Sequence, residues 1–285
     1  MASINAKRVV VDSGATKTDW CFIGEKDGEK ICKSFVTEGI NLAIMKREDI
    51  VKVMENLTSQ VGREMIEEVE EIDFYGAGIV SQNAAPAIRS ILRDAFPHAW
   101  KISLSSDIVG AARALFRGGS GVVAIMGTGS NSCMYQNGSI TRNICPGGFI
   151  LGDEGSGAAL GRMLLSDYIK VLVPEDLKKD LDENFDLNYS KIVTMVYQSA
   201  APSRFLASFV KFLFEHKENE YVSNLIDSNI RAFIERSLSR YECSEIGVVG
   251  SFGVACRENL ERIGAEYGLH FVKFLKSPIE GLKNL

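Results

Sequence analysis

Three short turns rich in glycine, serine and threonine each follow an apolar strand and could hold a nucleotide. They are Asp12–Thr18, Gly127–Asn131 and Gly250–Gly253. Small residues let the backbone approach a phosphate, whose oxygens accept hydrogen bonds from amides and hydroxyls. The candidate nucleotide-binding residues are Ser13, Gly14, Ala15, Thr16 and Lys17, then Gly127, Thr128, Gly129 and Ser130, and finally Gly250 and Ser251. The alternative for each is an ordinary glycine turn. The Walker A, dinucleotide-binding G-x-G-x-x-G and G-x-S-x-G motifs are all absent from the sequence.

Three carboxylates stand at positions where phosphoryl transfer would need them. Asp12 ends a strand and could hold Mg²⁺, mostly through waters. Asp107 lies between a strand and a helix, where it could act as a general base or simply cap the helix. Asp153 belongs to Gly152–Gly157, whose acids suit a helix start. We expect the glycines around Asp153 to allow close approach of a polar ligand.

Hydrophobic periodicity predicts the elements that must position these residues. The first half predicts three strands, then helix, strand, helix, strand and helix. Their ranges are Val9–Val11, Cys21–Ile23, Ile31–Val36, Ile50–Val69, Ile72–Tyr75, Ala84–Phe96, Lys101–Leu104 and Asp107–Phe116. The order then restarts with a strand at Gly121–Met126 and a hairpin around Asn137-Gly138. Ser13 and Thr128, at matching turns, are 115 residues apart.

This repeat predicts a duplicated α/β fold with two related domains facing each other across a cleft. We place the first domain at residues 1–117 and the second at 118–285, with a helical insertion at about 174–240. Further helices are predicted at Ser156–Val171, Phe205–Glu215, Tyr221–Ser239 and Val254–Tyr267.

Composition excludes several classes of protein. Of 285 residues, 46% are hydrophobic and 24% are charged, which is typical of globular chains and excludes disordered and coiled-coil ones. The net charge of −5 gives no electrostatic basis for binding nucleic acid or an anionic membrane. The six cysteines form no C-x-x-C pair, and residues 1–11 lack an apolar export segment. We therefore expect reduced thiols and a cytoplasmic location.

These turns, in this order, resemble the BadF/BadG/BcrA/BcrD-type ATPase group, and within it N-acetylglucosamine kinases. The resemblance runs from about Arg8 to Leu275 and implies two ribonuclease H-like domains of the sugar kinase/Hsp70/actin superfamily. It implies that the three turns bind ATP with Mg²⁺ and that Asp107 is the catalytic Asp. It further implies sugar binding by residues Asn41, Asp107, Gly147, Gly148 and Asp153. The family's Gly-Gly-Trp-Gly is replaced here by Gly-Gly-Phe-Ile, in a stretch about two residues shorter.

The resemblance implies ATP-dependent phosphorylation of an amino sugar, with N-acetylglucosamine and its 6-phosphate as first choice. N-acetylmuramic acid and other hexoses are alternative substrates, and the partners expected are small molecules and, in a homodimer, a second copy. A rival from another class is an ATPase activator of a partner enzyme, which shares an Fe–S cluster between subunits. Cys133 and Cys145 are the pair such a cluster could use. A sugar sensor would need an added DNA-binding segment, for which residues 1–8 leave no room.

Overall fold

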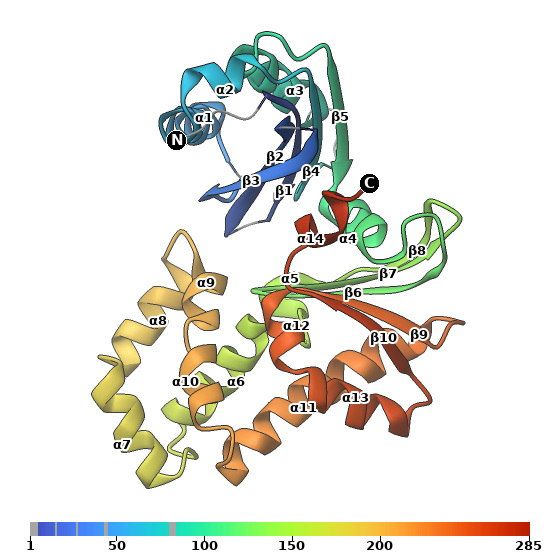
Figure 1. Cartoon of the computed structure of the whole chain (residues 1–285). Coiled ribbons are helices and arrows are strands. Elements are labelled where there is room, and N and C mark those ends of the chain that lie inside the picture. Colours follow the sequence, from blue (N-terminus) through green and yellow to red (C-terminus); the bar gives the residue numbers. More distant parts are fainter. Residues whose placement is uncertain (1–4, 15, 27, 43–44, 80–83) are drawn as a thin grey trace. The chain divides into compact units, whose positions relative to one another are not determined.

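The computed structural model describes residues 5–14, 16–26, 28–42, 45–79 and 84–285, which form two compact units (Figure 1). Unit 1 comprises residues 1–118 and 277–285, and unit 2 comprises residues 119–276. The predicted boundary after residue 117 is close to this division. The last nine residues differ from the prediction, because they belong to unit 1 rather than to the second half.

Unit 1 is built on a five-stranded mixed sheet with the order β3-β2-β1-β4-β5. Strands β1, β2 and β3 are an antiparallel meander, and β1, β4 and β5 are parallel. The bounds are Asn5–Ser13 for β1, Lys17–Lys26 for β2, Glu29–Glu38 for β3, Glu71–Gly76 for β4 and Lys101–Ser106 for β5. The central position of β1 brings its carboxyl end, Asp12-Ser13, beside the ends of β4 and β5.

The helices of unit 1 bury the apolar side chains that the periodicity singled out. Helices α1, α2 and α3 form a core with β1, β2 and β4 that includes Leu57, Ile72 and Ile88. The helix bounds are Arg47–Val61 for α1, Arg63–Glu67 for α2, Ala84–Ala95 for α3, Asp107–Phe116 for α4 and Ile279–Leu282 for α14. The single helix predicted over Ile50–Val69 is wrong, because Gly62 takes a φ of 90° and separates α1 from α2.

The carboxyl-terminal helix α14 packs against α4 within unit 1. A side-chain carbon at Gly281 would lie 2.4 Å from the carbonyl oxygen of Ala114, so only glycine allows this approach. The hydroxyl of Ser277 donates to the carboxylate of Asp19 at 2.9 Å. These contacts explain why the chain returns to unit 1 after its last strand.

Unit 2 repeats the sheet of unit 1 strand for strand, with the order β10-β9-β6-β7-β8. Here β6, β7 and β8 are antiparallel, whereas β6, β9 and β10 are parallel. The bounds are Gly121–Met126 for β6, Ser130–Gln136 for β7, Ser139–Ile144 for β8, Glu245–Val249 for β9 and His270–Leu275 for β10. The predicted α/β fold with a duplicated domain is confirmed.

The helices of unit 2 cover the sheet and build a second core. Its members include Ala124 of β6, Leu160 of α6, Phe233 of α11 and Ile263 of α13. The bounds are Gly148–Leu151 for α5, Gly157–Ile169 for α6, Glu175–Asn184 for α7, Tyr189–Tyr197 for α8, Pro202–Ala207 for α9, Val210–Glu215 for α10, Glu220–Arg236 for α11, Leu238–Arg240 for a 3₁₀ turn, Ser251–Ala255 for α12 and Arg257–Glu266 for α13. No helix in the described part of the chain is long and apolar enough to cross a membrane.

The expectation that every cysteine is a reduced thiol is wrong for one pair. Cys21 of β2 and Cys32 of β3 form a disulfide, with Cα atoms 6.1 Å apart. The strands pair Cys21 with Ser34 and Ile23 with Cys32, so the two cysteines are diagonal neighbours on one face of the sheet. Their sequence spacing of 11 residues gave no C-x-x-C signal, and only strand pairing brings them together. The other four cysteines are free.

Candidate functional site

The first glycine turn joins β1 to β2 in unit 1. The amide of Gly14 donates to the carbonyl of Lys17 at 3.0 Å, which closes the turn. The nearest atom to a side-chain carbon at Gly14 would be 3.8 Å away, so a ligand can approach the backbone there. Lys17 is exposed and pairs with Asp19 at 2.8 Å. Ala15, also predicted to bind phosphate, lies outside the described residues.

The buried hydroxyl of Ser13 ties the first turn to the loop that contains Asn41. It lies 2.7 Å from the hydroxyl of Thr18 and accepts a hydrogen bond from the amide of Ile40 at 3.0 Å. The amide of Gly39 donates to the carbonyl of Thr16 at 3.2 Å. The structure therefore brings the predicted phosphate turn and the predicted sugar loop side by side. The hydroxyl of Ser13 is therefore engaged within the protein.

Carboxylates crowd the carboxyl end of β1. Asp12 is opposite Asp19 in β2, and burial raises its pKa to about 7, with the negative charges of Asp19 and Asp107 adding to the effect. Lys17 opposes this shift. Among the described residues, no three His, Cys, Asp or Glu side chains are close enough to hold a metal ion by themselves. Mg²⁺ usually keeps several waters and needs one or two carboxylates plus phosphate oxygens, so the excess charge at Asp12 suits it.

Asp107 is the first residue of α4, immediately after β5. Its carboxylate accepts a hydrogen bond from the amide of Ile108 at 2.9 Å. The helix cap position belongs to Ser106, whose side chain makes no capping bond. Burial raises the pKa of Asp107, and hydrogen bonds from backbone amides partly offset that shift. A carboxylate with a raised pKa at a strand-to-helix junction has the properties of a general base.

The second glycine turn joins β6 to β7 in unit 2 and is fixed to the start of α6. The first amides of α6, those of Gly157 and Ala158, donate to the carbonyls of Gly127 and Thr128, each at 2.9 Å. The hydroxyl of Ser130 donates to the carbonyl of Glu154 at 2.7 Å. A side-chain carbon at Gly127 would have its nearest neighbour 4.0 Å away, so the backbone is open to a ligand at this point.

Asp153 lies directly against the second turn. The backbone amide of Ser130 favours the ionised form of its carboxylate and so lowers its pKa. A side-chain carbon at Gly129 would come within 2.9 Å of the same carboxylate. Asp153 is 8% exposed and has a φ of 55°. Burial raises its pKa, the charge of Glu154 adds to the shift, and Arg162 opposes it. The structure thus joins two features that the sequence predicted separately, a phosphate turn and a sugar carboxylate.

Packing inside unit 2 already accounts for glycines around Asp153 for which we expected ligand approach. A side-chain carbon at Gly152 would lie 1.9 Å from the carbonyl oxygen of Pro146. One at Gly155, where φ is 74°, would lie 2.6 Å from Phe233. Gly147 and Gly148 have positive φ values of 79° and 70° and open the short helix α5. These conformations and close contacts need glycine whether or not a ligand is bound.

The third turn meets the second within unit 2. Gly250 takes a φ of 124°, and a side-chain carbon there would lie 2.1 Å from the carbonyl oxygen of Met126. Its amide donates to the carbonyl of Leu275 at 2.9 Å. Ser251 is exposed and begins α12. Gly127 and Gly250 therefore lie side by side, at the ends of the parallel strands β6 and β9.

Sequence reasoning missed two residues that hold the Asp153 loop, Arg162 of α6 and Asn229 of α11. The guanidinium of Arg162 donates to three carbonyls of the loop, and the amide side chain of Asn229 bonds Gly155 and Ser156. Arg162 is the only charged residue in the run from Gly155 to Ser166, a signal that could have marked it. Asn229 gave no comparable signal.

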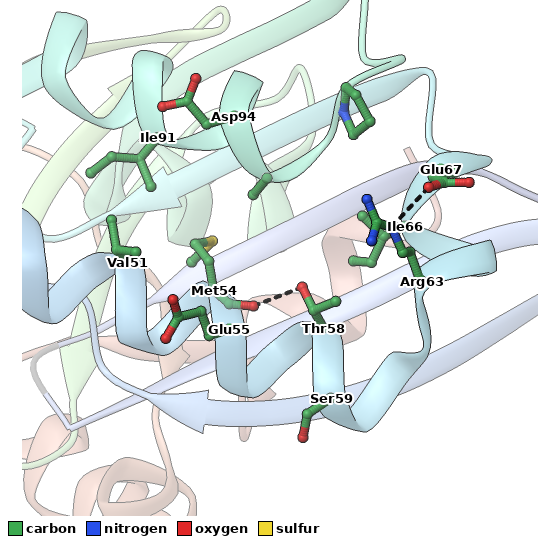
Figure 2. A pocket seen from close by; sticks show the side chains of 12 residues that line it. Val51, Met54, Glu55, Thr58, Ser59, Arg63, Ile66, Glu67, Ile91 and Asp94 are labelled. Carbon is green, nitrogen blue, oxygen red and sulfur yellow. Dashed lines mark hydrogen bonds and ion pairs between the residues drawn. The ribbon is translucent and has the colours of Figure 1, made fainter.

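A hollow of about 680 Å³ lies elsewhere in unit 1, between α1, α2 and α3. Figure 2 shows Val51, Met54 and Ile91 at this hollow, with the ion pair of Arg63 and Glu67 at one end. None of the predicted site residues lines it.

Comparison with known families gives one match that spans most of the chain. The model of the BadF/BadG/BcrA/BcrD ATPase family matches residues 9–220, a range that contains the first two turns, Asp107 and Asp153. A search of curated protein sequences finds no significant match.

Comparison with solved structures gives matches over nearly the whole chain. A Porphyromonas gingivalis protein, provisionally assigned as an N-acetylglucosamine kinase, is 35% identical, with a TM-score of 0.89 and 97% of both chains covered. A Chromobacterium violaceum protein with the same provisional assignment is 17% identical, with a TM-score of 0.74 and 97% of both chains covered. A ROK family glucokinase from Streptomyces griseus, in complex with glucose and AMPPNP, is 13% identical, with a TM-score of 0.58 and 96% of both chains covered. The last two matches establish likeness of fold.

Proposed function

Because the chain belongs to the BadF/BadG/BcrA/BcrD ATPase family, we propose that it is an ATP-dependent kinase that phosphorylates N-acetylglucosamine to its 6-phosphate. The observation that carries this proposal is the 35% identity, over 97% of both chains, to the Porphyromonas gingivalis protein provisionally assigned that activity. The position of Asp153 against the second turn supports it as well, because a sugar ligand and a phosphate ligand would then share one site in unit 2.

The phosphates of the nucleotide would lie at the first and second glycine turns. The open approach to Gly14 and Gly127 leaves room for phosphate oxygens at both turns. The third turn, Gly250-Ser251, would support the nucleoside, since it adjoins Gly127. Mg²⁺ at Asp12 would supply positive charge to the phosphates, and the burial that raises the pKa of Asp12 favours such a cation.

Asp107 would accept the proton of the attacking sugar hydroxyl. The buried position that raises its pKa brings it closer to the range in which a general base works near neutral pH. Asn41, in the loop tied to Ser13, and Asp153, in unit 2, would hold sugar hydroxyls, with Gly147 and Gly148 shaping the start of α5. Phosphoryl transfer depends mostly on such positioning and on charge neutralisation.

An ADP-release assay tests the proposal directly. The panel contains N-acetylglucosamine, N-acetylmuramic acid, glucosamine and glucose, and phosphorus NMR identifies which hydroxyl carries the phosphate. We expect the highest kcat/KM with N-acetylglucosamine. Wild-type protein that binds MgATP but releases no ADP with any of these sugars would contradict the proposal.

N-acetylmuramic acid is a second candidate substrate, favoured by one observation. Ile150 and Leu151 of α5 are 68% and 80% exposed, a few residues before Asp153. Two exposed aliphatic side chains could contact the extra lactyl group of this sugar. Strong discrimination against it in kcat/KM would remove the candidate.

The rival function, an ATPase that activates a partner enzyme through a shared Fe–S cluster, has less support than the kinase function, because of the state of the cysteines. Cys133 is fully buried in β7, and burial raises the pKa of its thiol to about 12, which disfavours the thiolate that an Fe–S cluster needs. We expect the purified protein to be colourless. A brown protein absorbing near 400 nm would reverse this ranking.

A further inference from the structure

Arg162 projects from α6 onto the backbone of the loop before Asp153. Its Nη1 donates to the carbonyl of Phe149 at 2.6 Å and to that of Ile150 at 3.0 Å. Its Nη2 lies 3.5 Å from the carbonyl oxygen of Gly152. These carbonyls belong to α5 and its carboxyl-terminal cap, a helix of only four residues. So short a helix leaves most of its carbonyls without intrahelical partners, and one guanidinium fork supplies donors for them.

The loop needs such support because Asp153 has a positive φ, which residues other than glycine seldom adopt. A φ of 55° at a residue other than glycine costs on the order of 1 kcal/mol and persists only when the surroundings impose it. The amide of Asp153 donates to the carbonyl of Pro146 at 2.9 Å, and the amide of Gly152 donates to that of Gly148 at 2.8 Å. These two bonds close the loop of residues 146–153 around the carbonyls that Arg162 contacts.

A second polar side chain grips the other side of Asp153. Asn229 of α11 is 1% exposed, accepts a hydrogen bond from the amide of Gly155 at 2.9 Å and donates to the carbonyl of Ser156 at 3.1 Å. Asp153 thus lies between two backbone clamps, one from α6 and one from α11. Both Arg162 and Asn229 form hydrogen bonds to main-chain atoms. These bonds fix the backbone conformation of the loop and do not depend on which side chains the loop carries.

We propose that Arg162 and Asn229 are positioning residues that hold the Asp153 carboxylate at the second turn, where it meets the sugar. The inference rests on the proposed kinase function for its effect on catalysis, and on the loop geometry alone for its effect on the backbone. Arg162 also contributes a positive charge near Asp153, which favours the ionised carboxylate. Neither residue would touch the reacting atoms.

Substitutions of Arg162 test the proposal, because its side chain is only partly buried and its loss leaves no cavity in the core. We expect Arg162→Gln to raise the sugar KM by roughly tenfold to a hundredfold, since small displacements in a site have effects of this size, with the ATP KM within about twofold of wild type. Arg162→Lys keeps the positive charge but not the forked guanidinium group. Its sugar KM should therefore lie between those of the wild type and Arg162→Gln. If Arg162→Gln does not fold, Arg162→Lys decides by the same criteria.

Arg236→Gln is the matched control. Arg236 also reaches this loop, but its contact is an ion pair with the side chain of Glu154 at 2.8 Å rather than with the backbone. Its substitution should leave the sugar KM unchanged. Three outcomes would overturn the proposal. The sugar KM could rise equally in Arg236→Gln, it could stay unchanged in Arg162→Gln, or the KM values for sugar and ATP could rise together in Arg162→Gln.

Hydrogen exchange separates failure of this inference from failure of the proposed function. The amides of Gly152 and Asp153 are hydrogen-bonded and should exchange slowly in the wild type. We expect Arg162→Gln to speed their exchange at least tenfold while α7 stays unchanged. This holds even if no sugar on the panel releases ADP. Unchanged exchange at both amides would refute the positioning role whatever the substrate.

Discussion

Alanine substitutions at Gly127 and Gly129 separate ligand binding from folding in the second glycine turn. At Gly127 a methyl group has no neighbour nearer than 4.0 Å and φ is not positive, so Gly127→Ala should fold like the wild type. Lower entropy of the unfolded chain should stabilise it by up to about 1 kcal/mol. At Gly129 the methyl group would come within 2.9 Å of the Asp153 carboxylate, which must then move away from the amide of Ser130.

The loss of the favourable interaction between the Asp153 carboxylate and the Ser130 amide sets the size of the second effect. Taken as equal to a hydrogen bond to a charged group, about 1.5–3 kcal/mol, it should make Gly129→Ala lower Tm by roughly 3–12 °C. Binding of MgATP acts in the opposite direction. At a hundred times Kd it stabilises the native protein by about 2.7 kcal/mol. A methyl group at Gly127 that blocks a phosphate should raise the Kd for MgATP at least tenfold. It should therefore remove about 1.4 kcal/mol or more of the stabilisation by MgATP.

Thermal unfolding followed by fluorescence, with and without MgATP, measures both effects. We expect Gly127→Ala to have a ligand-free Tm equal to that of the wild type or a few degrees above it, and to lose about half or more of the MgATP increment. A folded Gly127→Ala protein with the full increment would exclude the second turn from the nucleotide site. A Gly129→Ala protein with an unchanged Tm would show that Asp153 does not need its position against the turn.

Three further predictions concern unit 1. Asp107→Asn should lower kcat by about 10²–10⁴ and leave Tm and the MgATP increment intact; turnover near that of the wild type would reduce Asp107 to a structural residue. The pKa of Asp12 is raised from 3.8 to about 7, so the folded protein binds more protons than the unfolded chain between these values and loses stability as pH rises through that window. Denaturant unfolding of Asp12→Asn without Mg²⁺ should show a smaller loss over the same pH range, and parallel curves would contradict the shift. Reduction of the Cys21–Cys32 bond, or Cys32→Ser, should lower the free energy of unfolding by about 2–3 kcal/mol, and a wild type insensitive to reductant would argue against the bond.

Local signals in the sequence determined most of the elements and the ends of the strands that bear the site. The helix Asp107–Phe116 and the strand Gly121–Met126 have the predicted bounds, because apolar periodicity and turn residues act over a few neighbouring positions. The hairpin at Asn137-Gly138 follows from the same chemistry, with φ values of 50° and 86°. The matching strand order of the two sheets follows from a repeat that is visible in the sequence.

Only the tertiary structure decided which of these pieces meet. Three features join residues whose pairing no local pattern encodes: the placement of Asp153 against Gly129, the hydrogen bonds of Arg162 and Asn229, and the Cys21–Cys32 disulfide. The glycines near Asp153 looked like ligand contacts, since sequence alone cannot show that Pro146 and Phe233 occupy the space a side chain would need. Residues 277–285 pack in unit 1 for a similar reason, because the fit of Gly281 against Ala114 depends on two surfaces that form only when the chain has folded.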